Sequence, residues 1–95
     1  PAIHMDAPRE TVHEGAILYA TYCLYCHGVD AVAGALPDLR YASAEVHKEF
    51  VSIVVGGARE SRGMPKFNDV LDEKKARAIE AYVLSRAEES AKPVN

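Results

Sequence analysis

The sequence predicts an all-α domain with three main helices and long loops between them. Apolar side chains recur at the spacing of a helix in three segments, over about residues 12–22, 44–55 and 73–88. We find no convincing alternation of polar and apolar residues, the pattern that marks a half-buried strand. The 95 residues make one domain with a thin core, and such a domain usually needs a staple such as a disulfide, a metal or a cofactor.

The staple is indicated by residues 23–27, Cys-Leu-Tyr-Cys-His. Cys23 and Cys26 are separated by two residues and His27 follows directly, a pattern typical of c-type haem attachment. Each thiol can form a thioether with one haem vinyl group, and one helical turn sets the two sulfurs at a suitable distance. His27 then lies against the porphyrin plane and provides the proximal iron ligand. We therefore predict one covalently bound haem c, around which the long loops wrap.

Two other chemistries use a Cys-x-x-Cys pair. A redox dithiol of the thioredoxin type needs a βαβ setting, which the sequence does not offer. A zinc site needs further ligands, but both cysteines of the chain lie in this motif and there is no second His pair at the usual spacing. A zinc site that adds His27 and His47 to the cysteines is conceivable outside that spacing rule, and it stays open as an alternative.

The first helix is expected over about residues 12–22. Thr11 and Glu14 fit a capping box, in which each side chain accepts a hydrogen bond from the backbone N–H of the other residue. Residues 28–41 follow the attachment motif as a long loop that would wrap the cofactor. Pro37 is placed to present its carbonyl to the free ring nitrogen of His27, although an ordinary turn proline is an equal alternative.

The second helix is expected over about residues 44–55, with Ser43 as its N-cap and the Gly56-Gly57 pair at its end. His47 lies one position away from the apolar stripe, so we expect it on the surface. The stripe itself is expected to be buried and consists of Val46, Phe50, Ile53 and Val54.

A second long loop carries Met64, the natural candidate for the sixth iron ligand. A thioether opposite a histidine favours ferrous iron and raises the reduction potential. Pro65 biases Met64 towards an extended conformation, which helps to hold the sulfur out towards a cofactor. Core packing is the alternative role for a methionine. His13 and His47 are the competing sixth ligands, but both lie on expected helices that face elsewhere.

The last helix is expected over about residues 73–88, with Asp72 as its N-cap. Gly15 inside the first helix costs about 1 kcal/mol relative to Ala, which indicates close approach of another backbone at that point. Tyr19, one turn later, is expected to meet Tyr82 of the last helix. The expected inward face of the last helix consists of Ala76, Ile79, Tyr82, Val83 and Arg86.

Composition sets limits on location and partners. The net charge of −3 is mild, so nothing suggests nucleic acid as a partner, and no apolar run is long enough to span a membrane. The chain begins at Pro1 without a leader of basic and then apolar residues, which fits a mature or excised fragment. We expect a linker or N-terminal arm at residues 1–10, a domain at residues 11–90 and a tail at residues 91–95.

The order and spacing of these features resemble a class I cytochrome c over nearly the whole chain. The resemblance implies the class I cytochrome c fold, which is all-α and surrounds a covalently bound haem. The features that carry it are Gly15, Tyr19, the motif at residues 23–27, Pro37, Met64 and the amphipathic C-terminal helix.

A narrower likeness is to the C-terminal haem domain of quinohaemoprotein alcohol dehydrogenases. It is carried by Cys-His-Gly at residues 26–28, Gly-Ala-Leu-Pro-Asp-Leu-Arg-Tyr at 34–41 and Gly-Met-Pro-Lys-Phe at 63–67. In that family a propeller domain with pyrroloquinoline quinone (PQQ) oxidises an alcohol, and a Pro-rich linker joins it to the haem domain. The resemblance implies that this chain is such a haem domain, excised or free-standing, and is not itself the enzyme. Arg40 would then either pair with a haem propionate or stay solvated, and both remain open.

The expected function is electron transfer by a six-coordinate iron, because two strong axial ligands leave no open position for a substrate. The residues expected to line the haem are Tyr25, Leu36, Leu39, Tyr41, Ile53 and Phe67.

The resemblance implies a PQQ-containing dehydrogenase domain as electron donor and a small copper protein or cytochrome as acceptor. We expect a monomer in the periplasm, where c-type haem is attached in bacteria. A free-standing periplasmic cytochrome c is the alternative within the same class. A gas-binding or peroxidase-like haem protein is the alternative of a different class. That function would need a five-coordinate iron with Met64 idle, and we find no distal His or Arg arrangement to support it.

Overall fold

The computed structural model describes residues 6–23, 39–59, 64 and 66–91, and within these ranges all regular structure is helical. This confirms the all-α prediction for the described part of the chain. The elements in chain order are α1 (Arg9–Tyr22), the 3-10 turn η2 (Leu39–Tyr41), α3 (Ala44–Lys48), α4 (Phe50–Val54) and α5 (Glu73–Ala91).

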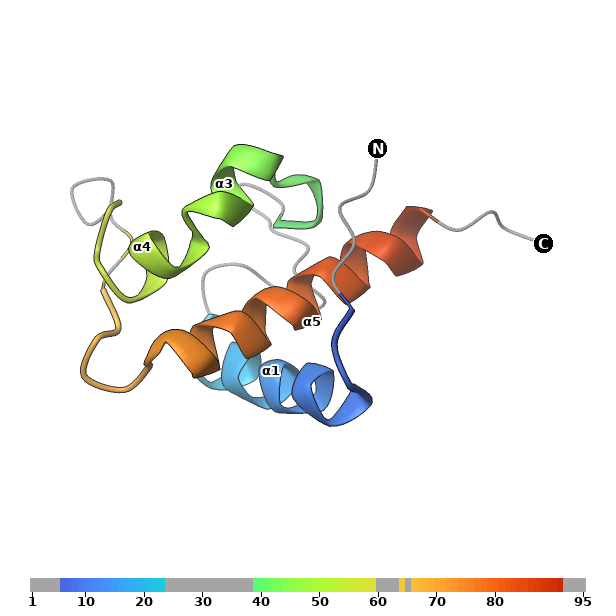
Figure 1. Ribbon diagram of the computed structural model, residues 1–95, viewed down its shortest axis with the longest axis horizontal. Helices are drawn as coiled ribbons and strands as arrows, with labels where there is room; N and C mark the ends of the chain where they lie inside the picture. The colour runs from blue at the N-terminus through green and yellow to red at the C-terminus, as the bar shows by residue number, and fades with distance from the viewer. Residues whose placement is uncertain (1–5, 24–38, 60–63, 65, 92–95) are drawn as a thin grey trace.

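The long helix α5 is the element against which the others pack. Figure 1 shows α1 beside it, running in roughly the opposite direction, while α3 and α4 lie on the other side of α5. The turn η2 also contacts α5. The hydrophobic core therefore lies between α5, the end of α1 and α4, and the two sides of α5 are both covered.

The first helix begins earlier than its sequence predicts. Pro8 is the N-cap, and its carbonyl accepts from the backbone N–H groups of Thr11 (3.0 Å) and Val12 (3.1 Å). The cap makes no side-chain hydrogen bond, so the prediction that Thr11 and Glu14 form the helix start is wrong. The physical reason is that Pro8 has a φ of −59°, already suited to a helix start, and no N–H that needs a partner.

Gly15 marks the place where the backbones of α1 and α5 meet. A Cβ atom added to Gly15 would lie 1.8 Å from the carbonyl oxygen of Ala78 and 2.5 Å from its carbon, so no side chain fits there. One turn later Tyr19 is buried, and its ring centroid lies 5.2 Å from that of Tyr82. Both contacts that the sequence predicts between the first and last helices are confirmed.

The expected second helix is two short helices. The Ser43 hydroxyl accepts from the backbone N–H of Val46 at 3.3 Å, which confirms the predicted cap. At Glu49 the backbone leaves the helical region (ψ 11°), and this residue separates α3 from α4, so the prediction of one continuous helix is wrong. After α4 the chain turns at Gly57 with a φ of +75°, as the predicted glycine end requires. His47 before the break and Phe50 after it are both buried.

His47 is buried, and the prediction of a surface histidine is wrong. Its exposed fraction is 7 %, and Nδ1 lies 3.1 Å from Oε2 of Glu80, a carboxylate of α5 with an exposed fraction of 3 %. The guanidinium of Arg77 donates to Oε1 of the same carboxylate at 2.7 Å. The His47 ring also stacks on that of Phe50, with centroids 6.0 Å apart. His47 is buried because it contacts Glu80, 33 residues further along the chain. The local apolar period does not reveal such a contact.

The last helix starts where predicted and ends later. The Asp72 carboxylate accepts from the backbone N–H of Lys75 at 2.9 Å, which confirms the predicted cap. The helix continues to Ala91, three residues beyond the expected end. Tyr82 and Arg86 are only half-buried, because α5 is covered on two sides and its buried positions extend beyond one stripe. The buried positions are Ala76, Ala78, Ile79, Glu80, Ala81, Val83 and Leu84.

We predict that Gly15→Ala destabilises the protein by about 2 kcal/mol or more, because the new methyl group would overlap the Ala78 carbonyl. Urea unfolding of the haem-loaded protein measures the change. The sign of the change in unfolding free energy is decisive, since Gly→Ala in an open helix stabilises by about 1 kcal/mol. The control Ala20→Gly, at an exposed position of α1, should cost about 1 kcal/mol.

We also predict that His47→Ala destabilises the protein by about 2 kcal/mol. The substitution removes a buried ring and leaves Glu80 with one of its two side-chain partners. The matched control is His13→Ala on the exposed side of α1, which should stay within about 0.5 kcal/mol. Equal thermal unfolding of the two variants would show that the His47–Glu80 contact contributes nothing.

Candidate functional site

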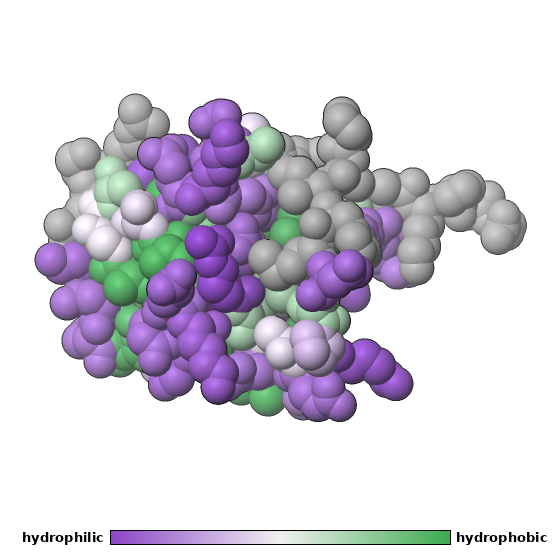
Figure 2. All heavy atoms as spheres, viewed as in Figure 1, coloured by the Kyte–Doolittle hydropathy of each residue, from purple (hydrophilic) through white to green (hydrophobic). Residues whose placement is uncertain are grey.

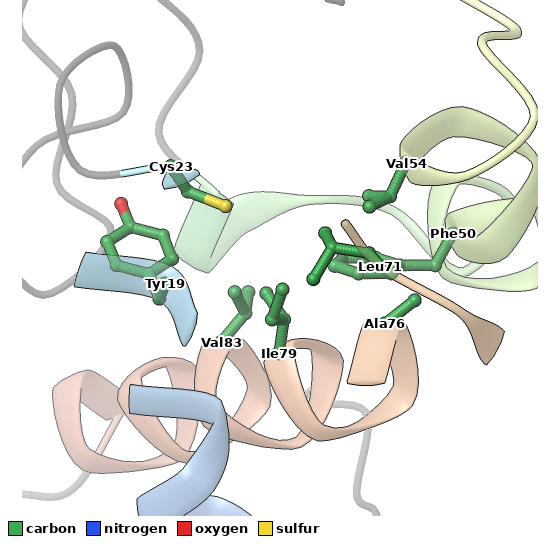
Figure 3. Packing of buried hydrophobic residues seen from close by; sticks show 8 residues of the cluster. All are labelled: Tyr19, Cys23, Phe50, Val54, Leu71, Ala76, Ile79 and Val83. Carbon is green, nitrogen blue, oxygen red and sulfur yellow. The ribbon is translucent and has the colours of Figure 1, made fainter. Parts of the chain in front are cut away.

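Cys23 lies at the end of α1 and points into the core. Its backbone N–H donates to the Tyr19 carbonyl at 2.8 Å, so the last turn of the helix fixes its position. The side chain has an exposed fraction of 8 %. Figure 3 shows the sulfur directed away from α1, over Val83 and Ile79 of α5 and towards Val54 of α4. The buried cluster around it consists of Tyr19, Phe50, Val54, Leu71, Ala76, Ile79 and Val83.

The chemistry of this cluster suits a large apolar group held by sulfur. A thiol can form a thioether, and the side chains around it are aliphatic or aromatic. A flat apolar macrocycle would therefore meet the surroundings that it needs. The described residues thus fit the cofactor that the motif at residues 23–27 predicts.

Met64 packs against the same cluster and is half-buried. Its backbone N–H donates to the Arg59 carbonyl at 3.2 Å. Two residues on, the stem of Lys66 lies so close to Gly57 that an added Cβ would be 2.8 Å from the Lys66 Cβ. Two features therefore require glycine at position 57: its positive φ and this close contact with Lys66. These interactions bring a second sulfur to the cluster that holds Cys23.

Phe67 connects the chain after Met64 to two parts of the fold. Its backbone N–H donates to the Val54 carbonyl at 2.8 Å, at the end of α4. Its own carbonyl accepts from the N–H groups of Val70 (3.0 Å) and Leu71 (2.7 Å). The ring packs against the cluster, and its centroid lies 5.9 Å from that of Tyr22 at the end of α1. Tyr22 was not among the expected site residues, although its place directly before Cys23 could have indicated it.

Other expected site residues are distributed as follows. Leu39 lies in η2 and packs against the cluster, and Arg40 beside it is half-buried. Ile53 is buried in α4. Cys26, His27 and Pro37 lie outside the described residues, as do Tyr25 and Leu36, and the side chain of Tyr41 is also outside them. The structure thus brings together Cys23, Leu39, Met64 and Phe67 around one cluster.

The described ranges contain only part of the alternative zinc site, because Cys26 and His27 lie outside them. His47, which that site would need, has its Nδ1 at the Glu80 carboxylate. Among the residues that the structure describes, no three His, Cys, Asp or Glu side chains lie together as metal ligands. His13, a competing sixth ligand, is exposed on α1.

Figure 2 shows hydrophilic side chains over most of the visible face, with hydrophobic ones gathered near α4. Within the described part of the chain, no helix has the length and apolar character that crossing a bilayer requires.

Comparison with known proteins gives consistent matches. Residues 10–83 match the family described as cytochrome c oxidase, cbb3-type, subunit III. The chain is 40% identical over 83 residues to quinohemoprotein alcohol dehydrogenase ADH IIB of Pseudomonas putida, covering 86% of this chain and 12% of that protein. It is 36% identical over 86 residues to 1-butanol dehydrogenase (cytochrome c) of Thauera butanivorans, covering 88% of this chain and 12% of that protein.

A solved structure agrees with these relatives. Quinohemoprotein alcohol dehydrogenase ADHIIG from Pseudomonas putida HK5 aligns with a TM-score of 0.80 and 38% identity, over 94% of this chain and 14% of that one. The chain therefore spans only about an eighth of the length of the curated relatives that it matches. The helical fold, the sulfur-bearing apolar cluster and the family match agree: the chain belongs to the cytochrome c family of the cbb3-type subunit III description, as a haem c domain homologous to those of quinohemoprotein alcohol dehydrogenases.

Proposed function

We propose that this domain transfers single electrons through a haem c that His27 and Met64 hold from opposite sides. When bound, the haem supplies a reversible change between ferric and ferrous iron. The observation that carries the proposal is the position of Met64, which packs against the same buried cluster as Cys23. A methionine on an outer loop surface would not suit this role.

Cys23 and Cys26 would attach the cofactor, and His27 would provide the proximal nitrogen. Pro37 would orient the His27 ring, while Leu39 and Phe67 would exclude water from the cofactor. Arg40, half-buried in η2, would pair with a propionate. With both axial positions filled, no substrate could reach the iron, so the domain would carry electrons and leave bond-making chemistry to its partners.

The donor would be a dehydrogenase domain that holds PQQ, since two of the relatives named above, ADH IIB and ADHIIG, are quinohemoprotein alcohol dehydrogenases. The acceptor would be a small copper protein or another cytochrome, met in a small and transient interface. The residues before α1 would connect the two domains, a shorter linker than the expected residues 1–10, because α1 already begins at Arg9. The periplasm would be the site of action. A monomeric haem domain fits this arrangement.

The proposed function predicts that the haem is attached covalently. After denaturation in acidified acetone, the haem should stay with the polypeptide, because thioether bonds survive this treatment. Mass spectrometry of the intact chain should show one haem added. Cys23→Ala should retain one thioether and leave one vinyl group conjugated, which moves the absorption of the reduced pyridine complex to longer wavelength. Haem that passes entirely into the organic phase would contradict covalent attachment.

The second prediction concerns the sixth ligand. Met64→Ala should lower the reduction potential and open the reduced iron to carbon monoxide, because a thioether favours the ferrous state. The oxidised native protein should show a weak far-red band from sulfur-to-iron charge transfer, and the variant should lose it. Leu71→Ala is a matched control that removes a cluster side chain and should leave the band in place. An unchanged potential in Met64→Ala would remove Met64 from the site.

A further inference from the structure

An aromatic contact links the two segments that bring sulfur to the site. Tyr22 is the last residue of α1 and directly precedes Cys23. Phe67 follows Met64 by three residues. Their ring centroids lie 5.9 Å apart with the planes tilted by 55°, a favourable arrangement for an aromatic pair. The contact thus joins the end of the attachment helix to the chain beside Met64.

Two kinds of contact hold Phe67. Its N–H donates to Val54 and its carbonyl accepts from Val70 and Leu71, so a variant without the ring should still fold. The ring contacts with Tyr22 and the buried cluster are a further restraint, which such a variant removes. The direction of the ring is then decided by its contacts with Tyr22 and the buried cluster.

Met64 cannot move independently of this anchor. Three residues of chain reach at most about 11 Å, so the position of Phe67 limits where Met64 can lie. The backbone N–H of Met64 has its own hydrogen bond to Arg59, at a longer distance of 3.2 Å than the 2.8 Å bond of Phe67 to Val54. On its C-terminal side Met64 is therefore restrained through Phe67, in addition to its own hydrogen bond to Arg59.

We propose that the Tyr22–Phe67 contact positions Met64 and so sets how often its sulfur leaves the iron. The inference rests on the proposed function, since it takes Met64 as the sixth ligand. Tyr22 and Phe67 are positioning residues, because they act through Met64. The contact also couples attachment to ligation, since the residue that orients Met64 stands next to the cysteine that attaches the haem.

The test uses imidazole as a competing ligand for the oxidised, haem-loaded protein. At saturating imidazole, the rate at which the far-red band disappears equals the rate at which Met64 leaves. Tyr22→Leu and Phe67→Leu should each raise this rate by about twofold to tenfold, the range expected for one lost aromatic pair. The double variant should be no faster than the faster single variant, because both changes remove the same contact.

Two control variants separate positioning from general loosening. Tyr22→Phe keeps the ring and should keep the native rate. Tyr82→Leu removes the other aromatic contact of α1, with Tyr19, which lies between α1 and α5. It should reduce thermal stability and leave the rate of Met64 release unchanged. An increase in Tyr82→Leu equal to that in Tyr22→Leu would overturn the inference.

The remaining outcomes are also decisive. Native rates in both Leu variants, with the far-red band present, would overturn the inference and leave the proposed function standing. Single effects that multiply in the double variant would show that the two rings act separately, which also overturns it. A native protein without the band would overturn the proposed ligation by Met64 and this inference together.

Discussion

The close approach of α1 to α5 at Gly15 is the constraint on which the rest of the structure depends. Two helices can come this near only where one lacks a side chain, and the Ala78 carbonyl occupies the space that a Cβ would need. The contact sets the direction of α1 across α5. Cys23 lies about two turns further along α1, so its sulfur enters the core at a place decided by the crossing.

The two sulfur side chains reach the cluster by different physical means. Cys23 is placed by a regular helix whose last turn ends on it, and Met64 by individual hydrogen bonds and side-chain contacts after α4. Cys23 is held by the regular hydrogen bonding of a helical turn. Each contact that holds Met64 is separate, so a single substitution can change one of them and leave the others. In the proposed ligation, Met64 would be the ligand that rests on the second kind of support.

Local chemistry explains which parts of the fold could be predicted. The caps at Ser43 and Asp72 depend on a side chain and a backbone N–H three residues away, so the sequence reveals them directly. Gly15 stands out because a glycine inside a helix has a cost that only packing offsets. The start of α1 after its N-cap Pro8 does not follow from the sequence, because the capping box that begins at Thr11 is the stronger local pattern and predicts a later start.

The sequence by itself determined the helical class, the haem c motif, Met64 as the candidate sulfur ligand and the pairing of the first and last helices. Each of these follows from the spacing of residues along the chain or from a residue whose type indicates one structural role. Only the tertiary structure decided that His47 is buried against Glu80, that the middle helix breaks at Glu49, and that Tyr22 meets Phe67. The two side-chain contacts join residues far apart in the chain, which a local period cannot reveal. The break at Glu49 is also hidden from the sequence, because the apolar stripe keeps its helical spacing on both sides of it.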